Sequence, residues 1–346
     1  MIVIIQSQLP HYRTGFFNKL SELEDVLIIH SGKTIVTASD RFSEIIVQER
    51  KLGPFSIQIG LIDIINKYKP SAVIAAFDIR NLMTFVLKVR LCSKMKWIWW
   101  GLDQGASKTA MTIKTWLARG RSPIVFYNRT VRDLFAARGL APDKLFVANN
   151  TFHVENHHSL HDHKSKDIFI NVGTLDPRKQ NDVLVRSFKV VLEQTGRDLS
   201  LYLIGEGRDR DMLTALIDEL KLNDRVFLTG KIEDPTVLEG YYARALASVS
   251  FGQAGLAVLQ SMAFGVPFVT KRSAVSGGEK YNIIDNYNGI FCNEDPCSLQ
   301  QAMMRLTEDE ETARTMGANA YTYYRDRASV DGMVEGFRLA LSYGAE

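Results

Sequence analysis

The chain has 346 residues, long enough for two domains, and 46% hydrophobic with 23% charged residues is typical of a globular protein. No run approaches the roughly 18 apolar residues of a membrane span. Net charge is only +3, but residues 1–150 hold 21 Lys and Arg against 11 Asp and Glu, whereas the remainder holds 21 against 28. A basic first half suits anionic lipid, nucleic acid or a polyanionic acceptor, and composition does not choose among them.

The opening MIVIIQSQLP lacks a basic region, so we expect a first strand rather than a signal peptide. The following apolar, β-branched runs predict strands separated by amphipathic helices. In the first half the predicted strands are 1–6, 26–31, 71–77, 96–101, 123–128 and 144–150. In the second half they are 167–173, 199–205, 225–230, 246–251, 267–271 and 289–293.

This alternation, met twice, predicts the α/β class with two tandem, doubly wound, Rossmann-like domains that face a cleft. We expect a first domain over 1–152, a polar linker over 153–166, and a second domain over 167–325. Residues 326–346 are expected to form a helix that crosses back to the first domain.

The stretch FGQAGLAVLQSMAFGVPFVT predicts a turn of small residues, with an accessible backbone, between a strand and a helix over 256–264. A glycine turn lets a ligand approach the backbone, and free N–H groups at a helix start favour an anion. Gln260, on that helix, is placed to reach a hydroxyl next to a bound phosphate. In NVGTLDPRKQ, Lys179 precedes another helix and is a mobile charge suited to phosphate.

The segments VGTLDPRK, LYLIGEG, RVFLTGKIED, GLAVLQSMAFGVPFV and NGIFC occur in an order that resembles retaining family-4 glycosyltransferases with the GT-B fold. PHYRTGFFNKL and FYNRTVRDLFAARGLAPDKLFVANNTF look like those of bacterial members that build surface polysaccharide. The chain departs from the family at three motif positions. Gly252 and Gln260 stand where the family has two glutamates, and Thr174 stands where it has an arginine.

The resemblance implies transfer of a sugar from a UDP- or GDP-linked donor to a hydroxyl of a glycan or lipid-linked acceptor, with retention. It implies no cofactor and no metal. Lys179 would stabilise charge on the departing diphosphate. The donor-binding residues implied with it are Gly173, Thr174, Gly230, Lys231, Ile232, Gln253, Ala254, Gly255, Leu256 and Gln260.

Candidates on the first domain follow predicted strands. Relatives often place a histidine where this chain has Leu102 or Asp103, and Asp103 is our candidate for a catalytic contact to the donor sugar. His11 is a second catalytic candidate, in the loop after the first strand. Arg13, Asp78 and Arg80 are acceptor-side candidates at strand ends. For Asp103, a helix cap is the alternative.

No metal site is predicted, although Asp209 and Asp211 form a D-x-D pattern and five histidines lie in the linker. Cys92, Cys292 and Cys297 have neither zinc spacing nor an even count, which indicates a reducing, cytoplasmic setting. Residues 108–121 form a basic amphipathic segment with Trp116, typical of peripheral contact with an anionic membrane at its inner face. The alternative for this segment is a helix packed on the sheet.

Two other functions stay open: a GT-B sugar-nucleotide epimerase, and an inactive binding or scaffold subunit, which the missing glutamate favours. No G-x-G-x-x-G follows the first strand, which disfavours a dinucleotide dehydrogenase. Nucleic acid is not expected as a partner, because the aromatic residues of the basic half have the pattern of core residues.

Overall fold

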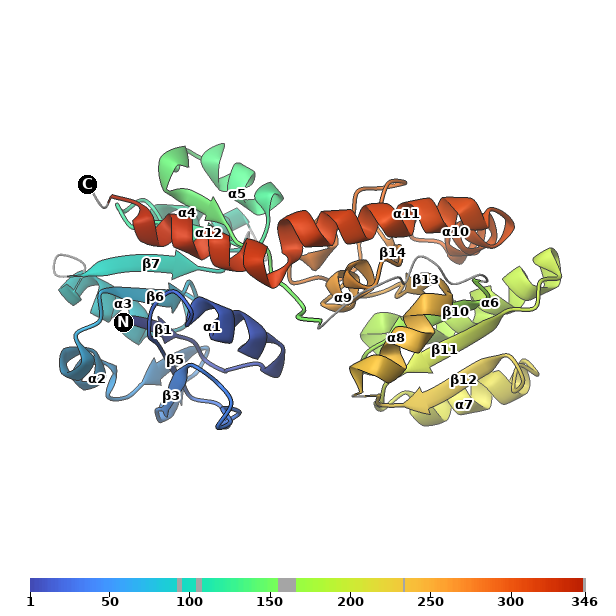
Figure 1. Ribbon diagram of the computed structural model, residues 1–346, viewed down its shortest axis with the longest axis horizontal. Coiled ribbons are helices and arrows are strands. Elements are labelled where there is room, and N and C mark those ends of the chain that lie inside the picture. The colour runs from blue at the N-terminus through green and yellow to red at the C-terminus, as the bar shows by residue number, and fades with distance from the viewer. Residues whose placement is uncertain (92–94, 104–107, 155–165, 233, 345–346) are drawn as a thin grey trace. The chain divides into compact units, whose positions relative to one another are not determined.

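The computed structural model describes residues 1–91, 95–103, 108–154, 166–232 and 234–344. It divides into one compact unit of Met1–His153 with Ala328–Glu346, and a second of Val154–Arg327 (Figure 1). Most of the expected linker, residues 155–165, lies outside the described residues, and so do four of its five histidines.

The first unit is built on a seven-stranded parallel sheet in which the first strand of the chain is an interior strand. β1 pairs in parallel with β2 on one side and with β6 on the other. The sheet order is β3 (Ser43–Ile46), β2 (Val26–His30), β1 (Ile2–Ile5), β6 (Ala72–Ala76), β7 (Lys96–Trp100), β8 (Ile124–Phe126), β9 (Leu145–Val147). A separate antiparallel hairpin joins β4 (Glu49–Leu52) to β5 (Phe55–Gln58).

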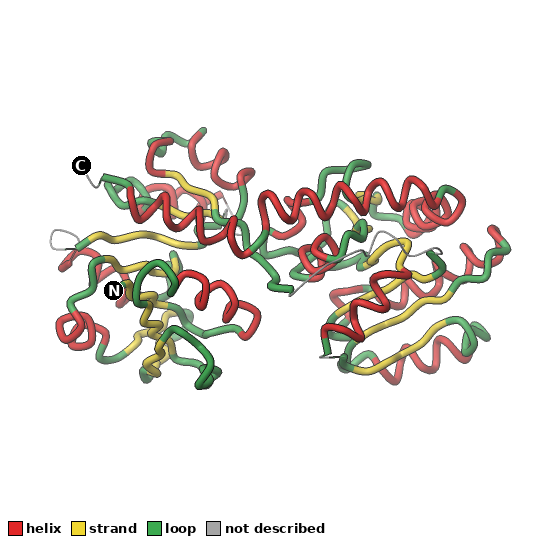
Figure 2. The backbone as a smooth tube through the Cα atoms, in the orientation of Figure 1, coloured by secondary structure: helices red, strands yellow, loops and turns green. Residues whose placement is uncertain are grey.

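Helices cover both faces of this sheet, as the tube in Figure 2 shows. They are α1 (Thr14–Leu20), α2 (Leu61–Tyr68), α3 (Leu82–Leu91), α4 (Lys108–Leu117), α5 (Arg129–Ala136) and the C-terminal α12 (Val330–Ser342). Phe337 of α12 packs on Phe16 of α1 and on Trp100 of β7, with ring centroids 5.2 and 5.0 Å apart. The last helix of the chain therefore completes the core of the first unit. On the other face, Trp99 packs on Phe85 of α3.

The second unit has a six-stranded parallel sheet. Its order is β12 (Val226–Gly230), β11 (Ser200–Ile204), β10 (Ile168–Val172), β13 (Ala245–Val249), β14 (Phe268–Lys271), β15 (Gly289–Cys292). Its helices are α6 (Asn181–Thr195), α7 (Arg210–Glu219), α8 (Pro235–Arg244), α9 (Ala257–Ala263), α10 (Pro296–Glu308) and α11 (Glu310–Tyr323).

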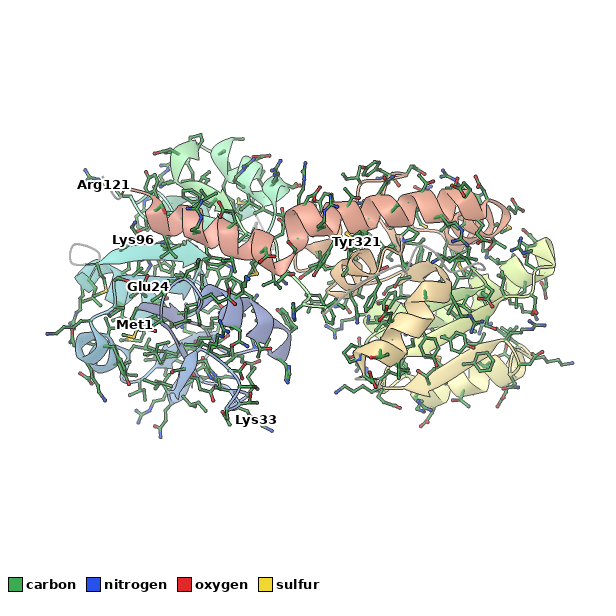
Figure 3. All side chains as sticks on the ribbon, viewed as in Figure 1. Met1, Glu24, Lys33, Lys96, Arg121 and Tyr321 are labelled. Atoms are coloured by element: carbon green, nitrogen blue, oxygen red, sulfur yellow. The ribbon has the colours of Figure 1, made fainter. Side chains whose placement is uncertain are left out.

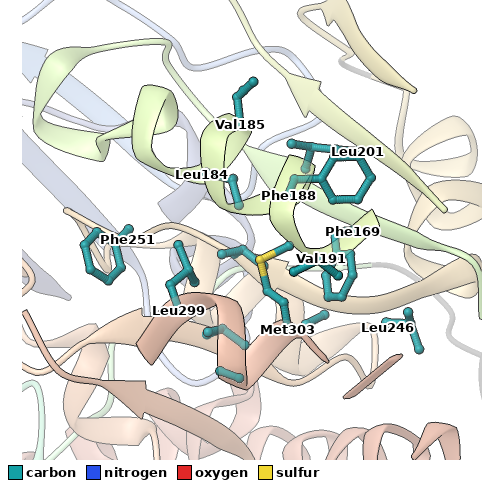
Figure 4. Close-up of a cluster of buried hydrophobic side chains, with 14 of the residues drawn as sticks. Phe169, Leu184, Val185, Phe188, Val191, Leu201, Leu246, Phe251, Leu299 and Met303 are labelled. Carbon is teal, nitrogen blue, oxygen red and sulfur yellow. The ribbon is translucent and has the colours of Figure 1, made fainter. Parts of the chain in front are cut away.

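A large apolar cluster packs α6, α7 and α10 on one face of this sheet (Figure 4). Phe188, Val191 and Met303 belong to it and are buried. On the other face Tyr242 of α8 stacks on Phe264, with ring centroids 4.4 Å apart. Buried on both faces, the strands needed the continuous apolar runs that made them predictable from the sequence.

Every strand predicted from the sequence is present, which confirms the predicted pair of Rossmann-like domains. The structure adds β3, β4 and β5, which sequence reasoning missed because each has only four residues and none is a continuous apolar run. Within the described residues, no helix combines the length and apolar character needed to span a bilayer.

Candidate functional site

Loops at the carboxyl ends of β10 and β11 are packed backbone against backbone. A Cβ placed on Gly205 would lie 2.1 Å from the carbonyl oxygen of Gly173. A Cβ on Gly207 would lie 2.1 Å from the carbonyl oxygen of Leu175. The glycines after β11, a weak signal in the sequence, are thus required by this close approach, which fixes the loop after β10.

Lys179 lies at the centre of these loops, in a 3₁₀ turn (Pro177–Lys179) before α6. Its side chain is only 9% exposed, and Nζ donates a hydrogen bond to the carbonyl oxygen of Val172 at 3.3 Å. Gly173 has φ +132°, and a Cβ there would lie 2.7 Å from Nζ. The ammonium group therefore lies directly against the glycine backbone at the end of β10.

The charge of Lys179 is poorly compensated. Burial, with the charge of Arg178, lowers the pKa of Lys179 from 10.5 to about 8, and Asp176 only partly opposes this. Asp176 is itself paired with Arg178 at 2.8 Å and Arg208 at 3.5 Å. No carboxylate is paired with Lys179 in the described part of the chain. A desolvated ammonium without a counter-ion favours binding of an anion.

The structure gives a steric reason for Gly252. Its N–H donates to the carbonyl oxygen of Lys179 at 3.0 Å. A Cβ on Gly252 would lie 2.2 Å from the carbonyl oxygen of Arg178. A glutamate, as the family pattern has there, would need the turn over 178–180 to move. The tight packing of this turn on the Lys179 loop therefore explains why position 252 has no carboxylate.

The turn after Gly252 offers backbone donors and one buried amide. Ala254 donates its N–H to Val275, whereas the N–H groups of Gly255 and Leu256 donate to no protein acceptor in the described residues. α9 begins at Ala257, a residue later than predicted, and has seven residues. The Gln260 side chain is 7% exposed and has no hydrogen-bond partner among the described residues. It is therefore available to a ligand hydroxyl.

The other expected donor residues lie around this turn or at the end of β12. Gln253 forms an isolated bridge with Val275, and Thr174 is exposed beside Gly173. Gly230 has φ +79°, and a Cβ there would lie 3.0 Å from a carboxylate oxygen of Glu206. Lys231 is exposed and Ile232 half-buried. The structure thus brings Lys179, Gly252 and Gln253–Leu256 together, with Gly230 at the end of the edge strand.

Sequence reasoning missed the loop after β14. The bridge between Gln253 and Val275 attaches this loop to the donor turn. Glu279 follows in it, buried, and accepts a hydrogen bond from the Ser276 hydroxyl at 3.2 Å. The signal was available as SGGE, a glycine pair after a predicted strand, the same pattern as in the other loops of the site.

In the first unit, three sequence candidates share one charged cluster at the carboxyl ends of β6 and β7. Arg80 donates to both carboxylate oxygens of Asp78, at 2.9 and 2.7 Å. Although burial opposes ionisation, these hydrogen bonds and the charges of Arg80 and Lys114 hold the pKa of Asp78 below its ordinary value. Asp103 forms an ion pair with Lys114 of α4. Asp78, Arg80 and Asp103 are therefore brought together.

Arg13 and His11 lie in a 3₁₀ turn (His11–Arg13) after β1 and have different surroundings. Arg13 donates to Gln6 at 3.0 Å and to the Tyr127 hydroxyl at 2.8 Å, and its guanidinium lies 4.5 Å from the centre of the Trp100 ring. These contacts give Arg13 a structural role within its own domain. His11 is exposed.

Among the described residues, no group of three or more His, Cys, Asp or Glu is arranged to hold a metal ion. The D-x-D pattern falls at the start of α7, where Asp209 is the N-cap residue and Asp211 lies in the first turn.

Residues 154–323 match the family model described as "Glycosyl transferases group 1". From Campylobacter jejuni, N-acetylgalactosamine-N,N'-diacetylbacillosaminyl-diphospho-undecaprenol 4-alpha-N-acetylgalactosaminyltransferase is 29% identical over 228 residues. That alignment covers 62% of this chain and 57% of the relative, so the chain spans little more than half of the relative's length.

Solved structures match over almost the whole chain. A glycosyltransferase from Rickettsia africae superposes with a TM-score of 0.77 at 15% identity, covering 99% of this chain and 97% of that one. Anabaena HepE in complex with UDP has a TM-score of 0.71 at 14% identity, covering 99% of both chains. The chain therefore has the GT-B fold, and the match of residues 154–323 supports its relationship to the group 1 glycosyltransferases.

Proposed function

We propose that the protein transfers a sugar from a UDP- or GDP-linked donor to a hydroxyl of a glycan or lipid-linked acceptor, with retention and without a metal or cofactor. The observation that carries this proposal is the buried ammonium of Lys179, which has no carboxylate partner among the described residues and is enclosed by the glycine loops after β10 and β13. An anion of high charge density is the ligand such a site favours, and a diphosphate is one.

In this proposal Lys179 stabilises the negative charge that develops on the departing diphosphate. The N–H groups of Gly255 and Leu256 bind phosphate oxygens, and the Gln260 amide binds a ribose hydroxyl without charge assistance. The backbone of Gly230–Ile232 borders the base. Because Gly252 carries no side chain, the carboxylate that relatives have there is replaced by backbone contacts.

The acceptor side is proposed to lie on the first unit. At its carboxyl edge, where ligands of parallel sheets bind, lie the acceptor-side candidates Arg13, Asp78 and Arg80. The catalytic candidates His11 and Asp103 follow strands at the same edge. The Campylobacter relative is named for an acceptor on diphospho-undecaprenol, which supports a lipid-linked acceptor here. Residues 108–121 would then contact an anionic membrane surface, at the inner face of the cytoplasmic membrane.

Thermal unfolding with UDP, GDP and ADP tests the donor site. A ligand at about 100 times its dissociation constant adds roughly 2.7 kcal/mol to the folded state. We expect stabilisation by one nucleoside diphosphate, lost in Lys179→Ala and kept in Lys189→Ala, a lysine of the following helix whose side chain is 37% exposed. No stabilisation by any diphosphate would overturn the proposal.

Turnover then separates the three candidate functions. Transfer that requires an added acceptor indicates a glycosyltransferase. Conversion of the sugar nucleotide without acceptor would indicate an epimerase instead. Binding with neither activity, across donors and lipid extracts, would indicate a scaffold subunit.

A further inference from the structure

Large apolar side chains are exposed at the C-terminal ends of two neighbouring helices of the first unit. Val89 of α3 is 80% exposed and Trp116 of α4 is 68% exposed. A Cβ placed on Gly120, just after α4, would lie 3.1 Å from Nζ of Lys88 in the last turn of α3. The two helix ends therefore lie close together, and each carries one exposed apolar side chain at the surface of the first unit.

A basic pocket of about 480 Å³ adjoins this surface. It is lined by Arg119, Gly120, Arg121, Gly139–Ala141, Lys144 and Tyr343. Figure 3 labels Arg121 at the edge of the first unit. Arg119 and Arg121 are exposed, and neither is paired with a carboxylate in the described residues. The lining residues in that part of the chain include no carboxylate, although the lining Tyr343 donates its hydroxyl to the Asp143 carboxylate at 2.8 Å. Three lining cations, Arg119, Arg121 and Lys144, outnumber this one neighbouring carboxylate, so the pocket is suited to an anion.

The pocket is held in shape by a buried lysine. Lys144 is 5% exposed, and its Nζ donates to the carbonyl oxygens of Ala118, at 3.1 Å, and Gly120. Burial and the charge of Lys88 lower the pKa of Lys144. These bonds fix the segment that carries Arg119 and Arg121 between α4 and β8. The two guanidinium groups thus extend from a backbone that is already ordered.

We infer that this surface, Val89 and Trp116 with Arg119, Arg121 and the pocket, docks on an anionic lipid bilayer. The two apolar side chains enter the interface, and the pocket receives a headgroup phosphate. The inference rests on the membrane contact proposed above and identifies the residues that make it. Lys114, which the sequence placed among the membrane-facing cations, does not belong to the surface, because it is buried and paired with Asp103.

The position of this surface agrees with the proposed function. The pocket segments precede β8 and β9, so the surface lies at the amino ends of the strands. Asp78 and Asp103 follow β6 and β7, at the opposite, carboxyl edge. Docking through the amino edge leaves the acceptor-side candidates uncovered.

The mixture of side chains favours a bilayer over nucleic acid. A nucleic acid would use the arginines but not an exposed valine, and one tryptophan gives no run of stacking platforms. A bilayer interface uses all of them, because aromatic and aliphatic groups enter below the headgroups while arginines bind phosphate.

Sedimentation of the full chain with vesicles tests the inference. Vesicles of phosphatidylcholine with phosphatidylglycerol are compared with phosphatidylcholine alone. We expect binding to the anionic vesicles only, weakened by salt. Reversing both charges, Arg119→Glu with Arg121→Glu, should lower the partition coefficient by roughly two orders of magnitude. Trp116→Ser should lower it roughly tenfold.

The matched control is Arg197→Glu with Lys221→Glu, which changes the net charge equally at exposed positions of the second unit. It should bind nearly as the wild type does. UDP or GDP stabilisation, measured in every variant, reports the donor site separately, so a failure of the proposed function is distinguishable. Absent binding of the wild type, equal loss in the control, or unchanged binding in both surface variants would each overturn the inference. A pocket that binds inorganic phosphate in a protein that binds no vesicles would also overturn the inference.

Discussion

Replacing Lys179 by methionine is expected to stabilise the unliganded second unit while abolishing donor binding. The pKa of about 8 in place of 10.5 corresponds to about 3 kcal/mol by which the folded site disfavours the ammonium. Loss of the hydrogen bond to Val172 offsets about 1 kcal/mol of this. Lys179→Met should therefore raise the free energy of unfolding by about 2 kcal/mol at pH 7.

The gain in unfolding free energy in Lys179→Met depends on pH. Because the pKa of Lys179 is lower in the folded than in the unfolded state, the wild type bears the full penalty below pH about 8. As the pH rises from there toward 10.5, the folded protein loses the proton and the penalty disappears. The advantage of Lys179→Met should shrink over the same interval. Diphosphate binding, which favours the ammonium, should weaken in the wild type over that interval too.

The measurement must report on the second unit alone. Tryptophan fluorescence does not, since all four tryptophans lie in the first unit. Cys292 is buried in the second core, and burial raises the pKa of its thiol to about 12, so it reacts only on unfolding. Pulsed thiol labelling across a urea series, in a Cys92→Ser, Cys297→Ser background that leaves Cys292 as the one thiol of the chain, gives the unfolding free energy of this unit.

The control is Lys189→Met, which removes a half-buried lysine of α6 that is paired with Glu193, and it should change stability by less than about 0.5 kcal/mol. Destabilisation of the second unit by Lys179→Met at pH 7 would contradict the expected burial penalty. A stability gain in this variant that does not change with pH would contradict it too.

Three further predictions concern the same site. Gly252→Ala should lower the free energy of unfolding by roughly 2 kcal/mol, because its Cβ meets the Arg178 carbonyl oxygen at 2.2 Å. Gly240→Ala, in open space on α8, should raise it by about 0.5–1 kcal/mol in the same labelling assay, and equal effects would contradict the packing argument. Gln260→Glu should tighten donor binding in calorimetry about fivefold through a charge-assisted hydrogen bond, whereas weaker binding would place the ribose elsewhere. Excess EDTA should leave the transfer rate unchanged, and a loss that Mg²⁺ restores would refute metal independence.

The sequence alone determined the architecture, because the architecture follows from local patterns of apolar residues along the chain. Strands buried on both faces need continuous apolar runs, and the ends of each predicted run lie within three residues of the observed strand. The order of glycine loops after these strands carried the family resemblance. Lys179 was also predictable as a candidate, since its place after β10 follows from the chain order alone.

Only the tertiary structure decided what these residues can do, because the deciding contacts join segments far apart in the chain. Gly252 has no side chain because the turn over 178–180 packs against it. Lys179 has a lowered pKa because loops from separate strands bury it. Arg13 is hydrogen-bonded to Tyr127, and Lys114 is paired with Asp103, contacts that sequence position did not suggest. Burial and pairing depend on distances in space, and a linear pattern does not contain them.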